Sequence, residues 1–211
     1  MQPITVTVGP LTAANDASIA ASQSPGSNAI VLTASPVTLD YPRQIVITST
    51  GDDSGITFTV TGTGYSGQSQ TEVLQGKNAT TTASVLNFAT VSSIVQSGAV
   101  AAAIKAGTTS VAGSRWVRFD SWALNPTAIQ ADISGSVNYT IQTTMDDPDD
   151  PFSPVTPVNV TWFSSTDAAV VGASTAKQSS FTNTPTFARV LLNSGSGSVT
   201  TTFAQFGNVP Y

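Results

Sequence analysis

The sequence contains no histidine and no cysteine. Without them the chain cannot form a Ser-His-Asp or Cys-His catalytic group, and it lacks the usual ligands of zinc. Disulfide bonds and thiolate chemistry are excluded as well, so the redox compartment cannot be inferred from cysteine use. Any chemistry would have to depend on carboxylates, hydroxyls, lysine or tyrosine.

Charged side chains are also scarce, at 9% of the chain compared with about 25% in ordinary globular proteins. The net charge is −5, and the seven basic residues are scattered. Binding of nucleic acid requires a clustered basic surface, so we expect none. Serine and threonine exceed a quarter of the chain and supply the polar surface instead. With 40% hydrophobic residues and low net charge, the chain is expected to fold.

Long apolar runs are missing too. The longest weakly apolar run, Ala99–Ala106, is rich in alanine and far shorter than the roughly 18 residues of a membrane span. The start of the chain, MQPITVTVGP, has neither the basic region nor the apolar region of a signal peptide. We therefore expect no membrane span and no signal peptide.

The clearest pattern that is present is an alternation of apolar residues and threonines around a turn. Its best copy is Ile45–Val60, IVITSTGDDSGITFTV, which predicts a β-hairpin. Related phrases with an apolar strand, a Ser-Gly turn and a Thr- or Ala-rich strand recur at 92–104, 130–144 and 188–203. The chain is therefore predicted to be a stack of such hairpins.

Strand signals recur roughly every 8–12 residues, a spacing typical of antiparallel sandwiches and barrels. The segment 106–114 is small and polar, and all three tryptophans lie beyond it. We therefore predict two tandem antiparallel β-sandwich or barrel-like domains, residues 1–112 and 113–211. A polar N-terminal arm or loop is expected at 11–29, and a long loop at 164–185.

One concentration of charge stands out, and it consists of Asp146, Asp147, Asp149 and Asp150. Calcium or magnesium binds several oxygen ligands, which makes this cluster a weak metal candidate. The spacing of an EF-hand is absent and the prolines restrict convergence, so the other interpretation is a solvated acidic loop. We assign no metal and no cofactor.

The remaining carboxylates do not predict catalysis. Asp52 and Asp53 fit the geometry of a turn, and Glu72 is expected to face solvent on a strand. No spacing singles out the pair of carboxylates that a glycosidase requires. We therefore predict no catalytic residue and no enzyme.

Large aromatic residues gather in the second half of the chain. Trp116, Trp122 and Trp162, together with Tyr139, could form a platform for a sugar ring. The favoured interpretation is that one or two of them anchor the core of a sandwich, because large aromatic side chains dominate small cores. Both interpretations remain open from the sequence.

The stretch 56–94, ITFTVTGTGYSGQSQTEVLQGKNATTTASVLNFATVSSI, resembles a widespread group of tailed-bacteriophage virion proteins. The matching positions are Thr61-Gly62-Thr63, Gly67, Glu72, Gly76 with Asn78, Phe88 and Thr90–Ile94. Segments 134–148 and 188–205 are similar to segments common in the same proteins. The resemblance implies a structural virion component without a catalytic residue. It does not specify capsid surface, neck or tail.

These features together predict a virion structural protein that is assembled in the host cytoplasm. A capsid decoration or cement protein is the first expectation, and a neck or tail accessory protein is the second. Expected partners are other virion proteins and copies of the chain itself, which would meet through Thr-faced sheets and edge strands. The alternative is a carbohydrate-binding module for host adhesion that uses Trp116, Trp122 and Trp162.

Overall fold

The computed structural model describes residues 3–120 and 126–205. Its named strands pair antiparallel, and helical structure within these ranges is limited to two short 3₁₀ turns, η1 (Pro157–Asn159) and η2 (Ala168–Val170). The predicted all-β, antiparallel fold class is therefore confirmed. In the described ranges, no helix has the length and hydrophobicity needed to cross a membrane.

The chain is organised as two compact units. The middle unit is Thr12–Ala112, and the terminal unit combines Met1–Leu11 with Gly113–Tyr211. Strand β1 (Ile4–Val8), which the sequence placed with the residues up to 112, pairs with β14 (Ser198–Gln205). The small polar segment 106–114, which suggested a linker between the two domains, is not one, because most of it belongs to strand β7 (Ile104–Gly113). Small polar residues form a regular strand there because β3 lies alongside and accepts their hydrogen bonds.

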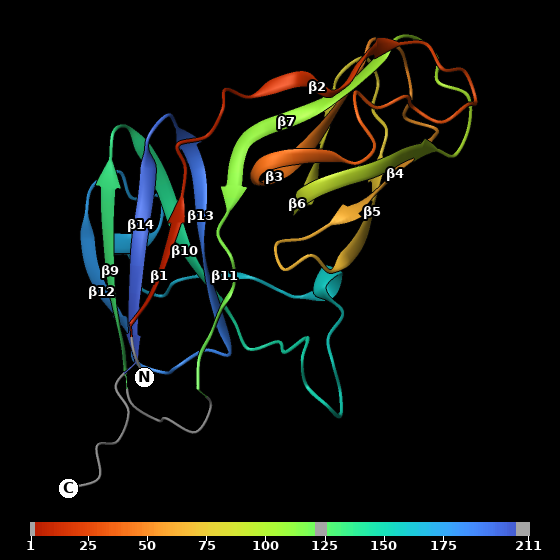
Figure 1. Cartoon of the computed structure of the whole chain (residues 1–211). Helices are drawn as coiled ribbons and strands as arrows, with labels where there is room; N and C mark the ends of the chain where they lie inside the picture. Colours follow the sequence, from red (N-terminus) through yellow and green to blue (C-terminus); the bar gives the residue numbers. More distant parts are fainter. Residues whose placement is uncertain (1–2, 121–125, 206–211) are drawn as a thin grey trace, which may run out of the picture. The chain divides into compact units, whose positions relative to one another are not determined.

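The middle unit is a single antiparallel sheet in the order β7-β3-β6-β4-β5, with β2 paired to β7 (Figure 1). Its remaining strands are β2 (Asn15–Gln23), β3 (Val37–Ser49), β4 (Thr57–Thr63), β5 (Ser69–Gln75) and β6 (Thr81–Gln96). The two longest strands, β3 and β6, pair with register shifts between Thr38 and Arg43 and between Gln44 and Val46. Such irregularities bend a strand and increase its twist. The sheet therefore curves around its own core.

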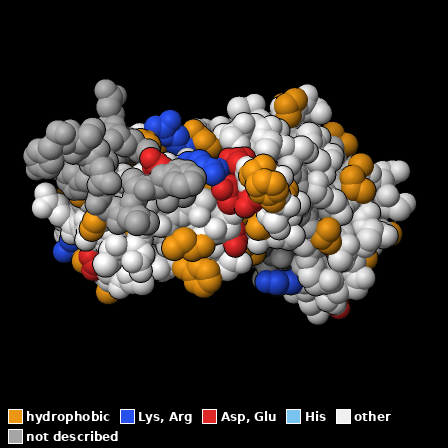
Figure 2. All heavy atoms as spheres, turned by 90° about the horizontal axis from the view of Figure 1, so that it is seen from below, with side chains coloured by type: hydrophobic (Ala, Val, Ile, Leu, Met, Phe, Trp, Pro, Cys, Tyr) orange, Lys and Arg blue, Asp and Glu red, His pale blue; other side chains and the backbone are white. Residues whose placement is uncertain are grey.

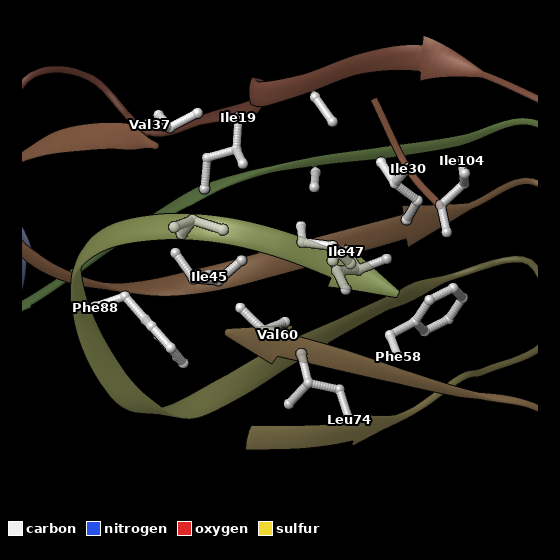
Figure 3. Packing of buried hydrophobic residues seen from close by; sticks show 14 residues of the cluster. Ile19, Ile30, Val37, Ile45, Ile47, Phe58, Val60, Leu74, Phe88 and Ile104 are labelled. Carbon is white, nitrogen blue, oxygen red and sulfur yellow. The ribbon is translucent and has the colours of Figure 1, made fainter. Parts of the chain in front are cut away.

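The alternation seen in the sequence builds that core. Ile45 and Ile47 of β3 and Phe58 and Val60 of β4 are buried and point into one interior (Figure 3). Ile19 of β2 joins them and is fully buried. The expectation of an extended polar arm at 11–29 is therefore wrong for its central part. Burial of apolar surface at about 25 cal/mol per Å² is what draws β2 onto the sheet.

The terminal unit is a sandwich of two sheets. One sheet has the order β1-β14-β9-β12, and the other has the order β11-β10-β13 with the short β8 on β13. The strands not yet bounded are β8 (Val117–Arg118), β9 (Thr127–Ser134), β10 (Val137–Thr144), β11 (Phe163–Ser164), β12 (Lys177–Phe181) and β13 (Phe187–Gly195). Three buried rings, Phe119, Phe181 and Phe203, pack with centroids 5.7 to 6.2 Å apart.

The segment 164–185, predicted as a long loop, contains the turn η2 and the strand β12. Val170 and Phe181 are buried and fix it to the sandwich. Between these two residues the side chains are small or polar apart from the exposed Val171, and Ala173 is the one buried position. No period of two or 3.6 could show in such a segment, which explains the wrong prediction.

The recurring phrases form strands, but they do not form hairpins. Within 45–60, strands β3 and β4 both pair with β6, which lies between them. Within 92–104, strands β6 and β7 are likewise separated by β3. Alternation shows which face of a strand is buried, but it does not select the neighbouring strand. A tight hairpin does occur between β4 and β5, and its turn contains Gly64 and Gly67.

In the terminal unit, the two remaining repeats, 130–144 and 188–203, each connect a strand of one sheet to a strand of the other. The turn after β9 leads to β10 in the other sheet, and the turn after β13 leads back to β14. The two turns lie against each other, since Gly197 donates its N–H to the Ser136 carbonyl at 2.9 Å. A Cβ at Gly197 would lie 2.1 Å from the carbonyl oxygen of Ser134, so only glycine fits there.

Replacing Gly197 with alanine is therefore expected to lower the unfolding free energy by about 1–3 kcal/mol, because the backbone of one turn must move away from the other. Thermal unfolding followed by circular dichroism would measure the change. Gly55→Ala is the matched control, since nothing lies within 4 Å of the position of its Cβ. Equal melting temperatures for the two variants would contradict the close packing of these turns.

Candidate functional site

The two described tryptophans lie together in the terminal unit. Trp116 precedes β8 and Trp162 precedes β11, and their ring centroids are 5.0 Å apart in an edge-to-face arrangement. Trp116 also meets the edge of Phe187, at 6.0 Å. Both indoles are partly exposed. Trp122 lies outside the described residues.

Tyr139 does not belong to this aromatic group. Its side chain is fully buried in the sandwich core, and its hydroxyl donates to the Thr175 carbonyl at 3.2 Å. Burial, with a contribution from the charge of Asp132, raises the pKa of Tyr139. Tyr139 is thus an anchor of the core, one of the two roles that the sequence left open.

An arginine completes the cluster of tryptophans. The guanidinium carbon of Arg189, on β13, lies 4.3 Å from the ring centroid of Trp162, within the range of a cation–π interaction. Its Nε donates to Oε1 of Gln142 at 2.9 Å, and Gln142 is its partner residue on β10. Burial lowers the pKa of Arg189 to about 10, so the side chain is still cationic at neutral pH.

A second arginine, Arg118, connects this cluster to the acidic loop. Its guanidinium lies 5.2 Å from the ring centroid of Phe187. It forms ion pairs with Asp147 at 2.6 Å and with Asp149 at 3.2 Å. The hydrogen bond to Asp147 is the main reason that the pKa of Arg118 is raised. Arg118 thus links two of the candidate aspartates to Phe187, the ring that Trp116 meets.

The four aspartates of the acidic loop do not converge on one point. Asp147 and Asp149 face Arg118, whereas Asp146 accepts the amide of Thr161 at 2.7 Å. Asp150 accepts the amides of Phe152 and Ser153, and these hydrogen bonds lower its pKa. In residues 3–120 and 126–205, no group of three or more acidic side chains is arranged to hold a metal ion.

Two carboxylates of the middle unit accept hydrogen bonds from backbone amides. Glu72 was expected to face solvent, but its two oxygens accept the amides of Val85 and Leu86 at 2.7 and 2.9 Å. Asp53 is buried, and it accepts hydrogen bonds from the Ser49 hydroxyl and from the Ala101 amide. These contacts join strands and loops of the middle unit, which is a structural use of a carboxylate.

Sequence reasoning missed one buried polar cluster, in the middle unit. Arg43 is 1% exposed and donates to the carbonyl oxygens of Thr12 and Thr109 and to Asp40. Burial tends to raise the pKa of Asp40, but hydrogen bonds from Thr12 and Tyr41 and the charge of Arg43 hold it below its ordinary value. The available signal was an arginine within an alternating strand, three residues after an aspartate.

A cleft of about 450 Å³ lies beside this cluster, and Thr12, Asp40 and Arg43 contribute to its wall. Both oxygens of Asp40 already accept hydrogen bonds from the chain itself. The charged groups of the cleft, Asp40 and Arg43, thus hold the segment around Thr12 to β3.

In comparisons with known proteins, no protein-family model, no curated protein and no solved structure matches this chain.

Proposed function

We propose that this chain is a non-enzymatic structural component of a phage particle. A capsid decoration or cement protein is the first choice, and a neck or tail accessory protein is the second. The phage assignment is supported by the sequence resemblance of 56–94, 134–148 and 188–205. The mechanism of assembly is supported by one observation: strand β5 ends its sheet, and the residues whose backbone groups point outward from it carry no charge.

Strand β5 is the last strand of the middle sheet and pairs with β4. Just beyond the two ends of this pair, Gly64 N–H donates to Gln68 O and Gly76 N–H donates to Ile56 O, each at 2.9 Å. Hydrogen-bonded and non-hydrogen-bonded pairs alternate along an antiparallel ladder. The backbone groups that point away from β4 are therefore those of Ser69, Thr71, Val73 and Gln75.

Most of the features that usually protect an edge strand are missing here. The four residues with outward backbone groups carry no charge, β5 contains no proline, and its pairing with β4 runs without a register shift. Its one charged side chain, Glu72, is bound to the amides of Val85 and Leu86. Natural proteins usually place lysine, proline or a bulge on such an edge to prevent pairing with another chain. An unprotected edge is what assembly by strand addition requires.

The exposed face of the sheet beside this edge also carries uncharged side chains. Thr59 of β4 lies between Val73 of β5 and Val95 of β6, and the two valines are 60% and 46% exposed. The next row consists of Thr71, Thr61 and Ser93. Charged side chains are likewise few among the coloured atoms of the face shown in Figure 2. Such a face can be desolvated against a neighbour without burying a charge.

The partner that fits this edge is a second copy of the chain. Antiparallel pairing centred on Val73 would bring the outward backbone groups of both copies together. It would also place Glu72 opposite Leu74 of the other copy, so the two glutamates would not face each other. A two-fold pair of this kind is the commonest symmetry of soluble oligomers.

Val73→Lys is expected to weaken self-association about tenfold or more, because two lysines would meet at the two-fold axis. Sedimentation equilibrium of the purified chain would measure the association constant, and addition of the chain to particles that lack it would measure assembly. Val31→Lys is the matched control, since Val31 is also exposed, at 73%, and lies outside the strands.

Two results would count against the proposal. An association constant unchanged in Val73→Lys would exclude β5 as the contact. A wild-type chain that stays monomeric at high concentration and does not add to particles would exclude assembly as the function.

A second candidate is a carbohydrate-binding module for host adhesion. It is favoured by the contact between Trp116 and Trp162 on the terminal unit, since paired and partly exposed indoles provide the apolar faces on which sugar rings stack. Loss of glycan binding in Trp162→Ala would support it.

A further inference from the structure

Two arginines on neighbouring strands of the terminal unit differ in how their charge is balanced. Arg118, which is 48% exposed, is paired with both Asp147 and Asp149. Arg189 is less exposed than Arg118, yet no carboxylate of the described residues forms an ion pair with it. The arginine that is more costly to desolvate is therefore the one without an anion.

The contacts of Arg189 satisfy only part of its guanidinium. Nε is bound by Gln142, and the plane of the group lies near the ring of Trp162. Within residues 3–120 and 126–205, neither terminal nitrogen of Arg189 donates a hydrogen bond. A guanidinium held in this way presents two parallel N–H donors, which match the two oxygens of a carboxylate.

The surroundings of these donors define the rest of a ligand. The indoles of Trp162 and Trp116 provide apolar surface, and both are partly exposed. Gln142 adds the amide NH₂ group as a neutral donor, because its carbonyl oxygen is already used by Arg189. Apolar faces, a neutral amide and a cation within one cluster suit a hydroxylated ring that carries an acidic group.

We propose that Arg189, Trp162 and Gln142 form a binding site for an acidic saccharide, with Arg189 holding the carboxylate of a uronic or similar sugar acid. This inference rests on the carbohydrate-binding candidate function and is independent of assembly through β5. An acidic peptide also carries carboxylates, but its extended side chains offer no ring to cover the two indoles.

The test is the binding of trigalacturonate to the full chain, measured by calorimetry and by tryptophan emission. Its methyl ester is the matched neutral ligand, because it keeps the three sugar rings and removes the negative charges. We expect trigalacturonate to bind about tenfold or more tightly than the ester, and Arg189→Gln to remove that difference. Arg115→Gln is the control variant, since Arg115 is exposed and its guanidinium donates to the Thr5 carbonyl.

Each outcome separates the inference from the function on which it rests. Equal binding of acid and ester would overturn the acidic site but keep a carbohydrate-binding module. Binding of neither would overturn both. Equal binding of a tri-glutamate peptide would overturn the saccharide in favour of a protein partner. Arg189→Gln must retain the wild-type melting temperature, and Arg189→Lys, which keeps the charge but not the fork, should bind with intermediate affinity.

Discussion

Arg43→Met is expected to lower the unfolding free energy of the middle unit by about 3 kcal/mol or more. The side chain is 1% exposed, and its guanidinium binds the carbonyl oxygens of Thr12 and Thr109. Methionine has a similar length but no donor, so these two carbonyls and the Asp40 carboxylate would lose their partner. Removing one member of a buried ionic group costs more than the group contributes as a whole, because the remaining polar atoms stay desolvated.

Hydrogen exchange of backbone amides in β4 and β6 would report this change, because both strands belong to the core of the middle unit. Lys77→Met makes the same kind of replacement at an exposed position and should leave exchange unchanged. A loss below about 1 kcal/mol in Arg43→Met would show that the cluster is hydrated and does not hold the segment around Thr12.

Phe203→Ala is expected to destabilise the terminal unit by about 3–5 kcal/mol. Phe203 is 1% exposed, and its ring packs against Phe119 at 5.7 Å and against Phe181 at 6.2 Å. The three rings come from the segment after β8 and from strands β14 and β12. Alanine would leave a cavity that these backbones cannot close, since paired strands on both sides hold them in place.

Tryptophan emission during urea unfolding would measure this loss selectively, because all three tryptophans lie in the Gly113–Tyr211 part of the chain. Phe152→Ala serves as the control, since that side chain is 96% exposed. If both variants unfolded at the same urea concentration, the three rings would not form the core described here.

The sequence predicted the class of fold and many strands, but it did not predict how the strands pair. Alternation at Ile56–Val60 and at 71–75 marked β4 and β5 correctly, and the glycines between them marked the turn. The phrases at 45–60 and 92–104 failed as hairpins because partner choice depends on strands far away in the chain. The sequence shows two separate strand-like stretches, 84–88 and 91–96, whereas the structure has one strand there, β6, whose irregular pairing with β3 cannot be read from composition.

For the candidate site, too, the sequence predicted residue types but not which residues meet. Tryptophan and aspartate could be recognised as candidates by residue type alone, and Trp116 does meet Trp162. The role of Arg189 could not be predicted, because its partners Gln142 and Trp162 come from other strands. Likewise, the ion pairs of Arg118 with Asp147 and Asp149 could not be predicted, because they depend on the pairing of β8 with the distant strand β13.

The pairing of β1 with β14 determines when each part of the chain can be completed during synthesis. Thr5 meets Thr202, 197 residues later, through both the ladder and their hydroxyls. The strands of the middle unit all emerge from the ribosome before β8 does. Translation therefore allows the inserted unit to close first, while β1 waits for a partner that arrives near the end of the described chain.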